Sequence, residues 1–546
     1  MKQAIFRPNE GADIVFINGT VITANANNDV CQAVAIQEEK IACVGSNNDM
    51  LPWIKEHTKI IDLNGKALTP GFIDSHSHFC NTGVKATSIV DISSNSVSSI
   101  EEIRTLLKEA VAKKKPGEWI RLQGYDQNKL IDQRHPTRWD LDDIAPDNPV
   151  QCSRCCNHMA VYNTCALKLG GFTGPDNYPE GHVVMENGEM TGLLKESTHM
   201  LLLEMIEKTD AEVLEGIIAA DQIFLSNGIT SIHDAGVDGF SGVGIMEKAT
   251  REGKIKTKIY ALIFDTNGKQ PIINMIRHYC GTGLKSGFGN EHFSIGACKL
   301  WMDGSTSGPS CATREPYSHD PNLPGLLVTD QEEANELISL AHNAGFQVTA
   351  HAIGDKAVEI FLNAVENALN ANPRENHRHR IEHGTILDND LVDRIKAMGI
   401  IPITNPGFFT VNSDDYVRYY GDRANMMYPL RDFIDKGIVA AIGADAPIIM
   451  PNPMIGIYGA ITRTDTIHGT TSGTKQSISV LEAIKMYTYN GAYASYEEHL
   501  KGSIEVGKAA DIAVLSKNIL DVEPKEILDI VIEMTLVDGE IVYSKL

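Results

Sequence analysis

Residues 69–79, TPGFIDSHSHF, place two histidines one residue apart at the end of an apolar, strand-like run. In an extended strand successive side chains point to opposite faces, so His76 and His78 project from the same face. Two imidazoles on one face can bind a metal ion together. The same pattern also occurs where histidines only decorate an exposed strand edge, so the rest of the sequence has to decide between the two interpretations.

The charge and the cysteine content of the chain limit its partners and its compartment. The 546 residues include 48 Lys and Arg against 71 Asp and Glu, a net charge of −23, which repels phosphate backbones and argues against nucleic acid as a partner. The N-terminus lacks the apolar core of a signal peptide, and no apolar run approaches the roughly 20 residues of a membrane span. Ten cysteines, two of them adjacent at Cys155 and Cys156, suit a reducing compartment. We therefore expect a soluble, cytoplasmic protein without a membrane partner.

The segment 152–165, CSRCCNHMAVYNTC, contains cysteine and histidine at spacings that could bind structural zinc. It lacks a second clean C-x-x-C pair, and free cysteine is among the most buried residue types. Core cysteines are the favoured interpretation.

Between residue 69 and about residue 450, short β-rich runs that end in polar or glycine-rich turns alternate with amphipathic stretches of helical length. This alternation predicts βα units around a parallel sheet, and eight such units close a (β/α)₈ barrel of the α/β class. The reactive groups of such barrels lie at the carboxyl ends of the strands. The eight runs are residues 67–78, 228–236, 258–264, 293–305, 345–354, 379–384, 399–406 and 437–447.

Six metal-binding or ionisable residues fall at those strand ends: His76, His78, Lys299, His351, His383 and Asp445. Singly, each has an ordinary structural explanation, such as a hydrogen-bonded core histidine, a lysine paired with Asp303 or an aspartate that caps a helix. Together on one rim they predict a site for divalent metal, because imidazole and carboxylate suit zinc and its neighbours. The lysine fits this set if carbon dioxide converts it to a carboxylate, N6-carboxylysine, which can bridge two ions.

Five motifs, TPGFIDSHSH, CKLWMDGS, VTAHAIGD, RIEHG and IGADAP, resemble those of the metal-dependent amidohydrolase superfamily. The residues of these motifs are most similar to those of the amidohydrolase family 3 branch, which includes N-substituted formamide deformylases. The likeness runs over nearly the whole chain, including residues 117–171 and the closing KGSIEVGKAADIAVL at 501–515.

The resemblance implies a three-part organisation. A small β-sandwich is assembled from residues 1–66 and 486–546, and the hydrolase barrel occupies residues 67–485. Residues from about 85 to 200 are too many for an ordinary βα loop and would form an inserted lid over the mouth of the barrel.

The resemblance also implies the roles of the rim residues. One metal is held by His76, His78 and Asp445, the second by His351 and His383, and carboxylated Lys299 bridges the two. Two zinc ions are expected, with manganese or iron as alternatives. Asp445 takes the proton from metal-activated water, whose hydroxide attacks the substrate, and hands it to the departing nitrogen.

Several weaker candidates carry two interpretations each. His158 in the insertion is expected to reach the substrate or to bond to backbone, and Arg314 to clamp a substrate carboxylate or to form a surface ion pair. Tyr125 either lines the pocket or packs the lid. His233 and Asp234 are expected to support the ligands rather than to bind metal.

The predicted function is hydrolysis of a carbon–nitrogen bond, most simply a non-peptide amide of a small molecule. A mononuclear deaminase is the alternative within enzymes; it needs one metal and is indifferent to Lys299. A non-catalytic scaffold is a third interpretation, which the complete set of ligand positions argues against. A homo-oligomer, for example a dimer, is compatible with the resemblance.

Overall fold

The computed structural model describes residues 6–94, 96–155, 159–203, 205–206, 208–236, 239–264, 269–323 and 325–545. It divides into two compact units, one comprising Met1–Thr82 with Ala220–Leu546 and the other Gly83–Ala219. The first unit holds a barrel and two further sheets, and the second holds a sheet of its own.

The barrel contains eight parallel strands whose order in the sheet follows their order in the chain. The predicted eight-stranded barrel is therefore confirmed. Beyond the last strand the ring closes onto the first through backbone hydrogen bonds from Asp445 N to His76 O (2.7 Å) and from His78 N to Ala446 O (2.7 Å). The strands are β8 (Phe72–Ser77), β15 (Ile229–Asp234), β16 (Lys258–Ile263), β17 (Phe293–Trp301), β18 (Val348–Ala352), β19 (Arg380–His383), β20 (Ile401–Thr404) and β21 (Ala441–Ile442).

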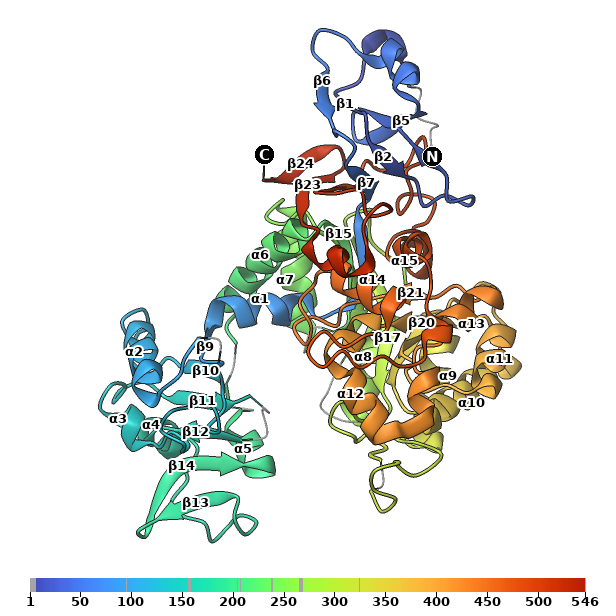
Figure 1. Ribbon diagram of the computed structural model, residues 1–546. Coiled ribbons are helices and arrows are strands. Elements are labelled where there is room, and N and C mark those ends of the chain that lie inside the picture. Colours follow the sequence, from blue (N-terminus) through green and yellow to red (C-terminus); the bar gives the residue numbers. More distant parts are fainter. Residues whose placement is uncertain are drawn as a thin grey trace. The chain divides into compact units, whose positions relative to one another are not determined.

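Helices alternate with these strands, as the amphipathic stretches predict. The Asp330 and Asp388 side chains cap α9 and α11 by accepting hydrogen bonds from the backbone N–H groups of Glu333 and Leu391. Helices α9, α10 and α11 lie side by side (Figure 1). The helices from α7 onward are α7 (Gly239–Arg251), α8 (Lys269–Gly281), α9 (Gln331–Asn343), α10 (Asp355–Ala371), α11 (Asn389–Met398), α12 (Phe409–Tyr420), α13 (Leu430–Asp435), α14 (Pro453–Thr462), α15 (Val480–Met486) and α16 (Tyr489–Ala494).

The strand expected at 67–78 is two strands in different sheets. β7 (Ala67–Pro70) pairs with β22 (Ile512–Leu515) and with β2 (Thr20–Ile22), whereas β8 joins the barrel. Gly71 separates them, and a Cβ atom there would lie 2.2 Å from the Thr230 hydroxyl oxygen. Only a residue without a side chain lets the chain pass so close to β15 as it leaves one sheet for the other.

The first unit has two smaller sheets, one built from N-terminal strands alone and one that combines strands from both chain ends. One has the order β5-β4-β1-β6 and the other β24-β23-β22-β7-β2-β3. Phe16, Leu68, Ile512 and Leu536 are buried in one apolar cluster, so residues from both ends share a core. The remaining strands are β1 (Ile14–Ile17), β3 (Val30–Cys31), β4 (Ala33–Gln37), β5 (Lys40–Gly45), β6 (Lys59–Asp62), β23 (Ile532–Val537) and β24 (Glu540–Ser544).

The second unit follows the first barrel strand, where the insertion was expected. It contains a six-stranded sheet of order β13-β14-β12-β11-β10-β9. The strands are β9 (Ile89–Asp91), β10 (Ile120–Tyr125), β11 (Val150–Arg154), β12 (Met159–Tyr162), β13 (Val183–Glu186) and β14 (Glu189–Lys195), and the associated helices are α2 (Ile100–Val111), α3 (Trp139–Asp142), α4 (Thr164–Leu169) and α5 (Glu196–Leu203). Helices α1 (Phe79–Ser88) and α6 (Asp210–Ser226) each run across a boundary between the units. The role of this unit as a lid stays a prediction.

Within the described part of the chain, none of the helices combines the length and the apolar character needed to cross a membrane.

Candidate metal centre

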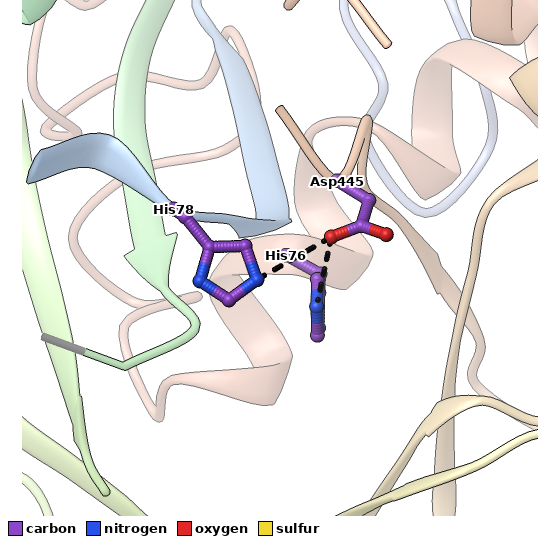
Figure 2. A group of neighbouring side chains, drawn as sticks. All are labelled: His76, His78 and Asp445. Atoms are coloured by element: carbon purple, nitrogen blue, oxygen red, sulfur yellow. Dashed lines mark ion pairs between the residues drawn. The ribbon is translucent and has the colours of Figure 1, made fainter. Parts of the chain in front are cut away.

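Three of the predicted ligands converge where the ends of β8 and β21 meet. Nε2 of His76 lies 3.4 Å from Oδ1 of Asp445, and Nε2 of His78 lies 3.5 Å from the same oxygen. One candidate ligand atom from each residue lies within 4.8 Å of the other two. Figure 2 shows both imidazoles directed at the one carboxylate. The arrangement fits a divalent ion, because two imidazoles and a carboxylate are a common protein ligand set for zinc and related metals.

A buried carboxylate fixes the orientation of His76. Nδ1 of His76 lies 2.5 Å from Oε2 of Glu382, and both side chains are at most 1% exposed. A carboxylate accepts, so we assign the proton to Nδ1. Nε2 of His76 is buried and makes no hydrogen bond with the described residues. Its lone pair is therefore available on the side that faces Asp445, as a metal ligand requires.

Glu382 is itself held by buried donors. Arg380 Nε donates to Oε1 (2.8 Å) and Nη2 to Oε2 (3.0 Å), and the Thr349 hydroxyl donates to Oε1 (2.5 Å). Arg380 is 0% exposed and also donates to His233 Nδ1 (2.9 Å). The sequence interpretation missed Glu382 and Arg380, although two charged residues within a short buried strand, in the motif RIEHG, were a signal that could have revealed them.

His351 and His383 each use one ring nitrogen in a hydrogen bond. Nε2 of His351 donates to the carbonyl of Gly304 (3.0 Å), and Nδ1 of His383 donates to Oδ1 of Asn405 (2.8 Å), because carbonyl oxygens only accept. The lone pairs therefore reside on Nδ1 of His351 and on Nε2 of His383. The two rings lie 4.6 Å apart, and the ring of His383 lies 4.7 Å from that of His76.

Two of these residues have unusual backbone conformations. His383 has φ 73° and Asp445 has φ 61°, both in the left-handed region that residues other than glycine rarely occupy. Consecutive side chains of a strand normally point to opposite faces. Here, however, Glu382 contacts His76, and the ring of the next residue, His383, also lies beside the ring of His76. The left-handed turn at His383 accounts for this, and such strain is typical of functional sites.

Lys299 projects from β17 and is 2% exposed. Its Nζ lies 5.3 Å from the centre of the Phe264 ring, and it makes no ion pair among the described residues. The expected alternative partner, Asp303, instead accepts hydrogen bonds from the N–H groups of Ala312, Ile353 and Gly354. Burial lowers the pKa of Lys299.

The pKa shifts of most of these side chains favour the deprotonated form, which is the form that binds metal. Burial, followed by the charge of His76, lowers the pKa of His383 to about 4, and burial also lowers the pKa of His78. Burial would raise the pKa of Asp445, but the neighbouring imidazoles of His76 and His78 outweigh it and hold the pKa well below its usual value. For His76, burial and Lys299 lower the pKa, and the carboxylates Glu382 and Asp445 outweigh them, so the net shift is upward. These carboxylates therefore attract positive charge to this point, which a metal ion can supply.

The weaker candidates are engaged in other contacts or lie outside the described residues. The guanidinium of Arg314 pairs with Asp388 (2.7 Å), Glu359 (3.1 Å) and Asp390 (3.3 Å), as the surface ion-pair interpretation requires. Tyr125 is buried in the core of the second unit, where its hydroxyl lies 3.0 Å from His135 Nδ1, which agrees with packing. His158 lies outside the described residues.

Imidazoles and a carboxylate at the carboxyl ends of the strands of a (β/α)₈ barrel define a metal-dependent hydrolase by fold and site. Comparison with known proteins agrees. A family model described as the amidohydrolase family matches residues 59–543, and the chain belongs to this family.

Similar proteins cover almost the whole chain. The putative amidohydrolase YtcJ of Bacillus subtilis is 30% identical over 97% of this chain and 99% of its own length. The N-substituted formamide deformylase of Arthrobacter pascens is 26% identical over 98% of both chains. An uncharacterized metal-dependent hydrolase from Pyrococcus horikoshii superimposes with a TM-score of 0.77 and 26% identity over 94% of this chain and 99% of that one. The protein is thus an enzyme, a metal-dependent hydrolase that acts on carbon–nitrogen bonds.

Proposed function

We propose that the enzyme hydrolyses a non-peptide amide bond of a small molecule at a centre that holds two divalent ions. The observation that carries this proposal is the buried Nε2 of His76, which has no hydrogen-bond partner in the described part of the chain and faces the carboxylate of Asp445 beside His78. The formamide deformylase among the relatives supports an amide as the substrate class.

The first ion would be held by His76, His78 and Asp445. The second would be held by Nδ1 of His351 and Nε2 of His383, the ring nitrogens that carry lone pairs. Lys299 would bridge the two after carboxylation, in which its neutral amine attacks carbon dioxide, a carbon–nitrogen bond forms and a proton passes to solvent. Burial and the lack of an ion pair among the described residues support this, because only the neutral amine reacts.

A divalent ion held by these residues would lower the pKa of water and polarise the amide carbonyl. Asp445 accepts the proton of the attacking water and delivers it to the departing nitrogen. This protonation is needed because the nitrogen is a poor leaving group as an anion. Glu382 holds His76 in one tautomer, so that its proton stays on Nδ1 throughout. Zinc is the expected metal, and manganese and iron accept the same donors.

A mononuclear deaminase is the alternative, favoured by the fact that only His76, His78 and Asp445 form a tight cluster in the described part of the chain. The two functions differ in their products. An amide hydrolase releases a carboxylic acid with an amine, whereas a deaminase releases ammonia. We would incubate the metal-loaded enzyme with N-substituted formamides, acylated amines, cyclic imides and aromatic amines. Formation of carboxylate by mass spectrometry supports the proposal, and ammonia from amines without any amide cleavage contradicts it.

We further propose a cytoplasmic location and a small-molecule substrate. No disulfide joins the described cysteines, which supports a reducing compartment, and the net charge of −23 opposes binding to nucleic acid. A homodimer stays a prediction.

A further inference from the structure

Trp301 lies one layer above Lys299 on the inner face of β17. Residues two apart in a strand share a face, so Trp301 projects toward the same side as Lys299 but nearer the carboxyl end. In the parallel pairing of β17 with β18, Trp301 is the direct partner of His351. Their rings lie 4.9 Å apart with an angle of 34° between their planes. The indole is therefore in contact with a proposed metal ligand.

The indole is both exposed and fixed in orientation. It is 41% exposed and is the only exposed residue of β17, all of which is described. Nε1–H donates to the carbonyl of Asp303 (2.5 Å), and the ring lies 6.1 Å from that of Phe264, tilted by 30°. A single exposed tryptophan is unremarkable by itself. Trp301, however, is held by a hydrogen bond from its ring nitrogen and lies against a proposed metal ligand, so its ring forms a flat apolar surface with a fixed orientation.

A second segment, which carries exposed apolar residues, is hydrogen-bonded to the backbone at the end of β17. Residues 326–328 lie antiparallel to the end of β17, with Val328 N donating to Met302 O (2.8 Å) and Leu327 opposite Asp303. The Thr329 hydroxyl donates to the carbonyl of Trp301 itself (2.7 Å). Leu326, Leu327 and Val328 are 56%, 38% and 52% exposed. Exposed apolar residues beside a candidate site commonly mark a binding surface.

We propose that Trp301 determines specificity, and that the substrate carries a flat apolar group, an aromatic ring in particular, next to the bond that is cleaved. This inference rests on the proposed amide hydrolase and deepens it. An aromatic ring gains from covering an exposed indole and from stacking against it, whereas a small aliphatic group gains little. Phe264, the residue that follows β16, lies beside the indole.

The test uses two hydroxamates that share a metal-binding head and differ in one phenyl ring. Binding of benzohydroxamate and of acetohydroxamate to the metal-loaded, full-length enzyme is measured by calorimetry for the wild type, Trp301→Ala and Trp301→Phe. We expect the wild type to bind benzohydroxamate at least about tenfold more tightly. The preference should shrink to near one in Trp301→Ala and largely persist in Trp301→Phe, with metal content unchanged.

Phe288→Ala is the matched control, because Phe288 is 60% exposed but precedes the opposite, amino end of β17. It should bind both probes as the wild type does. Equal affinities in the wild type, or a preference that survives in Trp301→Ala, would overturn the inference and leave the hydrolase proposal standing. If neither hydroxamate binds the wild type, the metal centre itself fails, and the inference fails with it. Should Trp301→Ala not fold, the wild-type ratio and Trp301→Phe decide.

Discussion

Nδ1 of His76 and Oε2 of Glu382 lie 2.5 Å apart, although 306 positions separate the two residues in the sequence. The contact joins the first barrel strand to the sixth and is fully buried. It assigns the proton to Nδ1 and leaves Nε2 free, and Arg380 balances the charge of the carboxylate. The orientation of a proposed metal ligand is thus set by a network inside the barrel.

Replacing Glu382 with Gln should weaken zinc binding about 10- to 100-fold, the usual effect of losing such a partner of a ligating histidine. Competition with a chromogenic chelator measures the affinity. Thr349→Val is the control, because it removes one hydrogen bond to the same carboxylate and leaves its charge and its contact with His76 in place. Equal losses in the two variants would assign the effect to general damage of the barrel.

The double variant His76→Ala, His78→Ala should bind no ion at the first position while the barrel still folds, because both imidazoles that face Asp445 are gone. Elemental analysis measures the loss of the ion, and circular dichroism tests whether the barrel still folds. His468→Ala, at a histidine that is 57% exposed, should leave metal content unchanged. Full metal content in the double variant would show that the ions lie elsewhere.

Asp445→Asn should reduce kcat by about 10² to 10⁴, the range for removal of an acid–base group. Metal content should fall far less, since His76 and His78 remain and the amide oxygen can still ligate. Rates on the best amide of the screening panel, normalised to bound metal, provide the measurement. Wild-type turnover per bound metal would mean that another residue moves the proton.

The joint between the barrel and the sheets built from both chain ends contains a buried cation. Lys258 Nζ lies 2.9 Å from Asp511 and 2.6 Å from Asp538, and the Lys258 side chain is 2% exposed. Burial would raise the pKa of Asp511, but Lys258 outweighs it and holds the pKa below the usual value. A folded-state pKa below the unfolded one gives stability that is present above about pH 4 and is lost as the pH falls through that range.

Lys258→Met should therefore lower the free energy of unfolding by about 3–5 kcal/mol at pH 7, because it removes the cation that pairs with the buried carboxylate of Asp511 and the partly buried carboxylate of Asp538. The deficit should shrink as the pH falls toward 4, where protonation neutralises them. Urea unfolding at several pH values tests this. Lys256→Met removes an exposed pair with Glu540 and should cost less than about 1 kcal/mol. A deficit for Lys258→Met that does not change with pH would contradict the account.

The sequence predicted the barrel because each of its eight strands can be recognised from its own residues, an apolar run that ends at a polar turn. It predicted where the ligand candidates lie because strand ends of a parallel barrel share one rim. The division of residues 67–78 between two sheets was not predicted, since it depends on the close approach of Thr230 to Gly71.

The contacts inside the barrel were likewise hidden, because they join residues that are distant in the chain. The sequence alone suggested Asp303 as a partner for Lys299, yet this carboxylate accepts hydrogen bonds from the backbone of Ala312 and of Ile353 and Gly354, which follow β18. Arg380 and Glu382 stand beside His383 in the sequence, but nothing local indicates that Glu382 reaches His76. The metal-binding roles themselves remain predictions.

The most direct test of the two-metal centre is the number of divalent ions per chain, measured by elemental mass spectrometry on protein purified without chelators and with bicarbonate present. We predict about two ions for the wild type and about one for Lys299→Met, because only a carboxylated lysine can bridge the pair. One ion in both proteins would contradict the binuclear hydrolase and favour the mononuclear deaminase, and no ion after reconstitution would contradict the metal centre altogether.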